Sequence, residues 1–317
     1  MIGTPPARLE ADEVGRWFGE VMAIGRCSLA VGGGVIGLLG QNGAGKTTLF
    51  KLLAGLITPS RGQVRLDGLV LRDHVGLFRR IGFCPESDAL PGWLTGREFL
   101  AMLARLAGVP RERVRPRVAE LLERFELTAA ANRRLGGYSK GMRQKLKLAQ
   151  AVAHDPDILF LDEPLNGMDP QSRLEAIAAI RRLGREGRTV LVSSHILPEV
   201  EQMTQNIVLI HRGKVLAEGD VAEIRDLIPE HPTVVALRCE RPRELAAFLV
   251  RQDHVAGVEC EGRDRVVVRT EHALAFYRAL PGQLLAAGQA VEEIHTLDDN
   301  LESVFSYLTD DSPGGSR

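Results

Sequence analysis

The chain has 317 residues, and its 40 Lys and Arg residues nearly balance its 41 Asp and Glu residues, for a formal net charge of −1. This balance gives no support to a nucleic-acid-binding protein, so we expect no nucleic-acid partner. The cysteines at positions 27, 84, 239 and 260 form no CxxC pair, which argues against a zinc site or a disulfide framework and indicates a reducing compartment.

The composition also bears on membranes and on domain number. The first 20 residues mix Pro, Arg, Glu and Asp without an apolar segment, so we expect no signal peptide. No apolar run approaches the roughly 18 residues of a bilayer-crossing helix, so any membrane role must come through a partner. The length suits two domains.

A glycine loop between an apolar strand and an apolar helix is the first motif along the chain. Residues 40–48 read Gly-Gln-Asn-Gly-Ala-Gly-Lys-Thr-Thr. Such a loop lets backbone N–H groups converge on phosphate oxygens, and the helix N-terminus adds its dipole. Lys46 would supply charge to the β- and γ-phosphates of a nucleotide, and the Thr47 hydroxyl would bind Mg²⁺. The predicted nucleotide-binding residues are Asn42, Gly43, Gly45, Lys46, Thr47 and Thr48.

Helical periodicity follows over residues 95–107 and 114–125, and Gly108 and Pro110 interrupt it. Residues 97–151 carry 13 Lys and Arg against 5 Asp and Glu. Such a face is usually only solvated. The alternative hypothesis is that part of it meets anionic lipid headgroups or an acidic loop of a partner.

A turn at residues 137–141 opens an amphipathic helix that reaches residue 151. Because Ser139 and the N–H groups near Gly141 stand at a helix start, they make a second anion site.

Residues 157–164 read Asp-Ile-Leu-Phe-Leu-Asp-Glu-Pro, an apolar strand that ends in two carboxylates. Continuous apolar character suits the middle of a parallel sheet covered on both faces. Asp162 would reach Mg²⁺, usually through water, and Glu163 would orient or deprotonate the attacking water. Taken alone, the carboxylates could instead cap the following helix.

In this combination of motifs the chain closely resembles the ATPase domain of ABC (ATP-binding cassette) transporters. Residues 138–142 stand where the family carries its signature loop, usually Leu-Ser-Gly-Gly-Gln, and the Ser-Lys-Gly-Met form resembles a variant common in exporters. The resemblance implies an α/β P-loop fold of ABC type over residues 1–228. This fold has a RecA-like core, an antiparallel β subdomain and a helical subdomain at about 87–153.

The resemblance also assigns roles at single positions. Phe18 stands where the family stacks an aromatic ring on adenine, with Trp17 as its neighbouring competitor and an ordinary core position as the plainer reading. Asp169, in the D-loop place at 166–169, would report across a dimer. His195, after the strand 189–194, occupies the switch position that contacts the γ-phosphate.

Position 86 departs from the family. Glu86 stands where the family more often has Gln, whose amide touches Mg²⁺ and the attacking water. A carboxylate could still bind Mg²⁺, but it adds negative charge beside a triphosphate.

The implied mechanism needs two copies and a membrane partner. ATP on Lys46 and Thr47 of one copy would be completed by Ser139 and Gly141 of the other, in a head-to-tail dimer. The dimer would power export through a separate integral membrane permease, at the cytoplasmic face of the cell membrane. The alternatives are a soluble ABC-type ATPase and, more distantly, a P-loop kinase or GTPase, which leaves residues 139–142 and His195 unexplained.

Beyond residue 229 the pattern predicts a β-α-β-β-α-β domain, of the split βαβ or ferredoxin-like kind, over 229–309. Its expected elements are residues 233–238, 242–251, 255–261, 265–270, 273–287 and 290–296. A last helix is predicted over 301–308, and the tail 310–317 is expected to be disordered. The histidines at positions 231, 254, 272 and 295 lack ligand spacing. The sequence does not choose among a regulatory, a dimer-stabilising and a partner-binding role for this domain.

Overall fold

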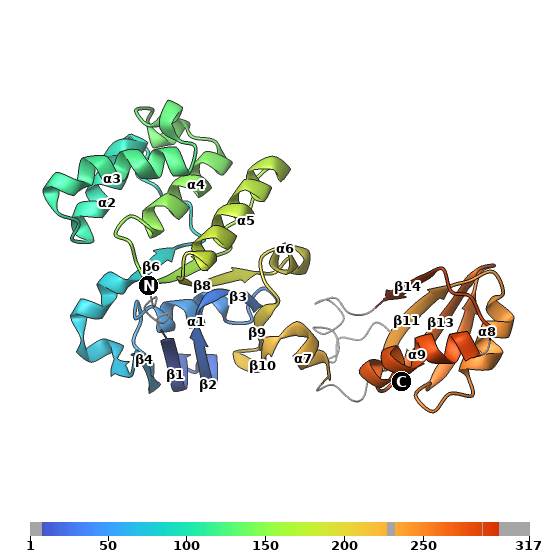
Figure 1. Cartoon of the computed structure of the whole chain (residues 1–317). Helices are drawn as coiled ribbons and strands as arrows, with labels where there is room; N and C mark the ends of the chain where they lie inside the picture. Colours follow the sequence, from blue (N-terminus) through green and yellow to red (C-terminus); the bar gives the residue numbers. More distant parts are fainter. Residues whose placement is uncertain (1–7, 227–231, 287, 298–317) are drawn as a thin grey trace, which may run out of the picture. The chain divides into compact units, whose positions relative to one another are not determined.

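The computed structural model describes residues 8–226, 232–286 and 288–297, and the chain divides into two compact units between Gly219 and Asp220 (Figure 1). The predicted domain boundary at 228–229, the predicted helix at 301–308 and the tail at 310–317 lie outside the described residues.

An antiparallel sheet with strand order β2-β1-β4-β5 begins the first unit. In β2, buried Cys27, Leu29 and Val31 alternate with exposed residues, so one face of the sheet packs on the core. The strands of this sheet are β1 (Arg8–Phe18), β2 (Val21–Gly32), β4 (Arg61–Leu66) and β5 (Leu69–Val70).

A second sheet has the order β10-β9-β3-β8-β7-β6, and the pairings from β9 to β6 are parallel. Every residue of β7 and β8 is buried, which accounts for the apolar runs at residues 158–161 and 190–192. The strands are β3 (Gly34–Leu39), β6 (Ile81–Cys84), β7 (Ile158–Asp162), β8 (Thr189–Ser194), β9 (Asn206–His211) and β10 (Lys214–Asp220). The carboxyl ends of parallel strands meet at one sheet edge, where α/β proteins bind ligands.

One hydrophobic core joins the two sheets through α1 (Lys46–Leu53). Phe50 of α1 meets Phe160 of β7 edge to face, with ring centroids 5.4 Å apart. The helices α5 (Pro170–Arg185) and α6 (Leu197–Glu201) contact β8, and α5 also contacts β3.

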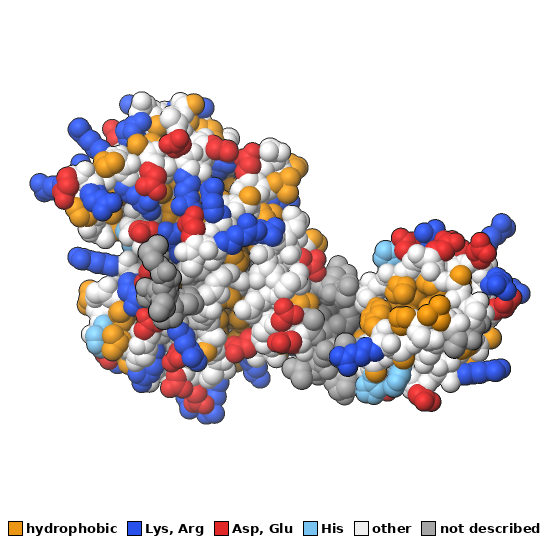
Figure 2. Space-filling model, viewed as in Figure 1, with side chains coloured by type: hydrophobic (Ala, Val, Ile, Leu, Met, Phe, Trp, Pro, Cys, Tyr) orange, Lys and Arg blue, Asp and Glu red, His pale blue; other side chains and the backbone are white. Residues whose placement is uncertain are grey.

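Three further helices form the helical part of the first unit: α2 (Gly96–Leu106), α3 (Arg111–Arg124) and α4 (Lys140–Ala151) (Figure 1). Thr95 and Glu98 form a capping box at the start of α2. Helix α3 begins three residues before the predicted position 114, because Pro110 takes its N-cap position. Lys and Arg side chains gather over this part of the surface (Figure 2). Short 3₁₀ turns complete the unit at Leu71–Asp73, Val75–Arg80, Thr128–Ala130 and Leu135–Gly137.

In the second unit α7 (Val221–Asp226) precedes an antiparallel sheet of order β12-β13-β11-β14. The elements are β11 (Thr233–Arg238), α8 (Pro242–Leu249), β12 (Gly257–Glu261), β13 (Arg265–Thr270), α9 (Ala273–Ala286) and β14 (Glu293–Thr296), so the predicted β-α-β-β-α-β order is confirmed. Leu245 of α8 and Phe276 of α9 pack with Val235, Leu237 and Val266 in one core, which places both helices on the same face. Within the described ranges, no helix has the length and apolar character that a membrane crossing needs.

Candidate nucleotide site

A hollow of about 730 Å³ lies where β3, β7 and β8 end. Its volume is within the range of small-molecule sites. It is lined by Val21, Met22, Ala23, Gln41, Asn42, Gly43, Gly45, Lys46, Thr47, Thr48, Glu86, Glu163, Asn166, His195, Arg212 and Gly213. All six predicted nucleotide-binding residues of the glycine loop are among them, together with Glu86, Glu163 and His195.

The loop before α1 needs glycine at two positions for different reasons. Gly45 is the N-cap of α1 and has φ 107°, a left-handed conformation that disfavours other residues. A Cβ atom on Gly40 would lie 2.4 Å from the carbonyl oxygen of Ile210, so only glycine fits there. The loop is also tied to the β9–β10 turn, where the Gly213 N–H donates to the Ala44 carbonyl at 2.8 Å.

Lys46 points back across this loop. Its Nζ donates to the Gly40 carbonyl at 2.7 Å and lies 3.4 Å from Oε1 of Glu163. The side chain is only 7% exposed. A charge this buried acts over short distances with little screening, so Lys46 is placed to meet an anion that enters the hollow.

Glu163 is held at three points in a strained backbone conformation. Its φ is 46°, which is rare for a residue other than glycine and concentrates at functional sites. The Glu163 N–H donates to Ser193 Oγ at 2.9 Å, and its carbonyl accepts from Gln144 Nε2 at 3.2 Å. Its Oε2 lies 2.9 Å from Nδ1 of His195. The structure therefore brings the predicted base and the predicted switch histidine into direct contact.

Asp162 lies at the carboxyl end of β7 and is 1% exposed. Its Oδ1 accepts from the Ser193 hydroxyl at 2.7 Å, so one serine fixes both carboxylate residues. Asp162 is not one of the residues that line the hollow. Its role at Mg²⁺ stays a prediction.

Glu199 is a buried carboxylate near this pair that the sequence did not indicate. It lies 3.2 Å from Arg173 and 3.4 Å from the Ser194 hydroxyl. Burial raises the pKa of Glu199, against the opposing effects of Arg173 and Ser194 and with a further contribution from Glu163. Its short helix, α6, gave no periodic signal that could have revealed this position.

The predicted second anion site lies outside this hollow. Ser139 is exposed and caps α4 by accepting from the Met142 N–H at 3.2 Å. Of the residues that line the hollow, none belongs to segment 138–142. Asp169 likewise caps α5, and the bond from the Ser172 N–H lowers the pKa of its carboxyl. A Cβ on Gly141 would lie 3.3 Å from Ser172 Oγ, so the signature and D-loop segments are neighbours.

Phe18 is 48% exposed, and its ring receives the Arg16 guanidinium at 4.6 Å. It is not one of the lining residues, and neither is Trp17. Its adenine-stacking role stays a prediction.

Seven residues that line the hollow were given no role of their own from the sequence: Val21, Met22, Ala23, Gln41, Asn166, Arg212 and Gly213. The last two form the turn between β9 and β10, where both have positive φ. An Arg-Gly pair between two apolar strands is a hairpin signal that could have located this turn, although not its place beside the glycine loop.

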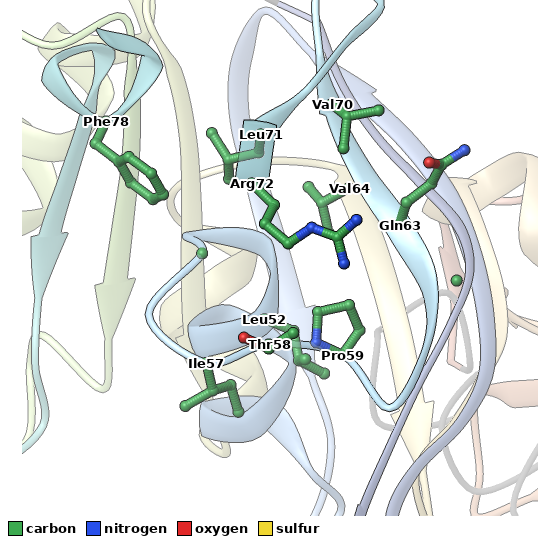
Figure 3. A pocket seen from close by; sticks show the side chains of 12 residues that line it. Leu52, Ile57, Thr58, Pro59, Gln63, Val64, Val70, Leu71, Arg72 and Phe78 are labelled. Atoms are coloured by element: carbon green, nitrogen blue, oxygen red, sulfur yellow. The ribbon is translucent and has the colours of Figure 1, made fainter. Parts of the chain in front are cut away.

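A second hollow lies at the other end of α1 (Figure 3). It measures about 110 Å³ and is mostly apolar, with Leu52, Ile57 and Phe78 around it. This volume is well below that of a site for a molecule as large as a nucleotide.

The sequence of the chain is similar to those of known proteins. The sequence model of a family described as ABC transporter matches residues 28–166. The daunorubicin resistance ATP-binding protein DrrA2 of Streptomyces coeruleorubidus is 36% identical over 312 residues, which cover 95% of this chain and 94% of that protein. The uncharacterized ABC transporter ATP-binding protein YxlF of Bacillus subtilis (strain 168) is 33% identical over 270 residues, covering 85% and 88%. The chain belongs to the ABC transporter ATP-binding proteins.

Solved structures agree with this membership. A structure titled as the ATP binding subunit of an ABC transporter is 29% identical, with a TM-score of 0.63, and covers 69% of this chain and 92% of that one. A dimeric structure of the cassette MJ0796 with ADP and Pi, 24% identical with a TM-score of 0.61, has the same fold over 67% of this chain and 98% of that one. The predicted family and the predicted α/β P-loop fold are thus confirmed, and with them the assignment as an ATP-binding ATPase subunit.

Proposed function

We propose that the chain hydrolyses ATP as a head-to-tail dimer and thereby drives export through a separate membrane permease. Two copies are needed because part of the expected anion donors is missing from the hollow at Lys46. Ser139 and Gly141 lie outside it, and Ser139 is exposed on the same chain. A second copy facing the first would supply these donors to the phosphates.

Glu163 acts as the general base in this proposal. The Ser193 hydroxyl and the Gln144 amide fix its backbone, so the carboxylate is held toward the hollow without rearrangement. His195 contacts the same carboxylate and would turn from it to the γ-phosphate. Lys46 would exchange its contact with Glu163 for one with the β- and γ-phosphates.

Thr47, Asp162 and Glu86 would hold Mg²⁺. One hydroxyl and two carboxylates are the oxygen ligands that this ion prefers, and Thr47 and Glu86 both line the hollow, so the residues fit the ion. When bound, Mg²⁺ supplies positive charge to the phosphate oxygens.

Export is supported by several relatives that are named as drug resistance ATP-binding proteins. DrrA of Streptomyces peucetius, described as a daunorubicin/doxorubicin resistance ATP-binding protein, is 36% identical over 256 residues. A permease partner places this chain peripherally at the cytoplasmic face of the membrane. Affinity purification of the tagged chain from detergent-solubilised native membranes should recover a polytopic membrane protein; recovery of soluble proteins alone would favour the soluble ATPase.

The position of Glu163 beside Lys46 and His195 carries the proposal and gives its test. Glu163→Gln should preserve ATP binding and lower turnover by about 10²–10⁴-fold. It should also elute as a dimer in ATP during size-exclusion chromatography, because the closed dimer no longer reopens by hydrolysis. Near-normal turnover would remove Glu163 as the base, and a monomer saturated with ATP would contradict dimerisation.

A further inference from the structure

Lys147 is a charged side chain in an unusual place. It lies in α4 and is 1% exposed, although a lysine is seldom fully buried. Its Nζ has three acceptors: the Glu86 carbonyl at 2.8 Å, Asp88 Oδ1 at 2.9 Å and the Ser87 carbonyl at 3.3 Å. An ammonium group has three donors, so its hydrogen-bonding capacity is met within one short segment, residues 86–88.

Two more side chains of the same helix reach inward at three-residue spacing, the spacing that places residues on one helix face. Gln144 donates to the Glu163 carbonyl at 3.2 Å, and Gln150 donates to the Phe83 carbonyl at 2.9 Å. Helix α4 therefore contacts the residue after β7, the segment after β6 and β6 itself. It also begins directly after Ser139, in the predicted signature loop.

We infer that Lys147 is a positioning residue for Glu86: it fixes the backbone of residues 86–88 to α4, so that a shift of the helix that begins at the signature loop moves Glu86 with it. This inference rests on the proposed function. Of residues 86–88 only Glu86 lines the hollow, so the backbone that Lys147 grips decides where that carboxylate lies.

The Lys147 ammonium lies in a poorly solvated environment. Cys84, at the end of β6, is buried and its thiol pKa is raised to about 12, mainly by burial and by the charges of Asp162 and Asp88, against the opposing charge of Lys147. The Lys147 ammonium is buried, whereas the Asp88 side chain is 36% exposed. Loss of the acceptors of Lys147 would therefore leave a buried charge without a partner.

Lys147→Met tests the inference, because methionine has similar length and no charge. Lys145→Met is the matched control, since Lys145 lies on the same helix and pairs with Glu126 and Glu175 at 2.7 Å, away from residues 86–88. We expect Lys147→Met to lower kcat about tenfold or more while KM for MgATP stays within about twofold, because a misplaced group weakens chemistry more than binding. Lys145→Met should keep kcat within about twofold of wild type.

A double variant distinguishes a positioning role of Lys147 from a nonspecific loss of structure. In Glu86→Ala the group that Lys147 positions is gone, so adding Lys147→Met should lower kcat by less than about twofold, because coupled residues are non-additive. A full tenfold loss in that background, or kcat of Lys147→Met equal to that of the control, overturns the inference. If Lys147→Met does not fold, Asp88→Asn takes its place with a smaller loss of about threefold, also expected to vanish in Glu86→Ala.

Parallel measurements on wild type and Glu163→Gln distinguish failure of the Lys147 inference from failure of the proposed function. Hydrolysis by wild type, its loss in Glu163→Gln and an unaffected Lys147→Met would reject the role of Lys147 alone. A wild-type chain that binds ATP without hydrolysing it, alone and with its membrane partner, would reject both.

Discussion

The two units bury polar groups in different ways. Among the described residues, the first unit buries Lys46, Gln144, Lys147, Asp162, Glu163, Thr189, Ser193, Ser194 and Glu199, whereas the second buries only Thr233 and Thr270. The charged groups of the second unit pair at its surface, as Arg238 does with Glu293, both about half exposed. Exposed pairs add about 0–1 kcal/mol each. The described part of the second unit is therefore held together mainly by apolar packing, whereas the first unit also contains buried polar networks, which rigidify the groups that they join.

Lys46→Ala should give the largest effect, because among the described residues Lys46 is the only buried Lys or Arg side chain that lines the hollow. We expect ATPase activity to fall by about 10²-fold or more. Affinity for a fluorescent ATP analogue should fall as well. Lys51→Ala, on the exposed side of the same helix, is the control and should behave as wild type. Tight binding by Lys46→Ala would mean that the hollow is not the site.

Ser193→Ala tests the network beneath the site. It removes the bonds to Asp162 Oδ1 and to the Glu163 N–H, so a buried carboxylate loses a partner. We expect a loss of about 1–3 kcal/mol in the free energy of unfolding, measured by urea denaturation. Because Glu163 also loosens, kcat should fall about tenfold. Unchanged kcat would show that Glu163 is fixed without Ser193.

Phe276→Ala tests whether the second unit contributes to stability without contributing to catalysis. Phe276 is 1% exposed in the core between α9 and the sheet, and its truncation should cost about 3–5 kcal/mol. Calorimetry should show the loss in one unfolding transition only, with the rate of ATP hydrolysis within about twofold of wild type. Phe160→Ala, in β7, should instead lower both stability and activity. Equal loss of activity in the two variants would show that the second unit contributes to catalysis.

Cysteine labelling should give the smallest effect on function. Burial, with the charge of Glu218, raises the pKa of Cys27 to about 12, and burial likewise raises that of Cys84 to about 12. Both thiols therefore stay protonated at pH 8, and reactivity belongs to the thiolate. Cys260 is exposed. Mass spectrometry after maleimide treatment at pH 8 should find Cys260 modified, Cys27 and Cys84 free, and ATPase activity unchanged; rapid modification of Cys84 would contradict the packing of β6.

Local patterns predicted most of the fold. Thr233–Arg238 and Arg265–Thr270 lie where the sequence placed them, because each is a short run of apolar, mostly β-branched residues, and the second follows the turn at Gly262. Strand β12 starts at Gly257 rather than at residue 255, since the Val255 N–H is bonded to Gln252 in the preceding turn. Such a bond depends on tertiary placement and leaves no periodic signal.

The site divides in the same way. Lys46, Glu163 and His195 belong to short motifs whose spacing carries the chemistry, so the sequence alone placed them together. Short motifs do not reveal Gln144, Lys147 or Ser193, because polar residues on an amphipathic helix or at a strand end are usually expected to be exposed to solvent. The burial of Gln144 and Lys147 follows from the contacts of α4 with Glu163 and with residues 86–88, and that of Ser193 from its place in the central strand β8. Both depend on tertiary packing.

In the proposed mechanism two copies of the chain share each nucleotide. Mixing two inactive variants tests this sharing most directly. Lys46→Ala lacks the loop charge, and Ser139→Arg places a bulky side chain at an exposed signature position. Each variant alone should hydrolyse ATP at background rate, and their mixture should regain activity, because a mixed dimer holds one intact site. No recovery from two folded variants, or full turnover by Ser139→Arg alone, would contradict a shared site.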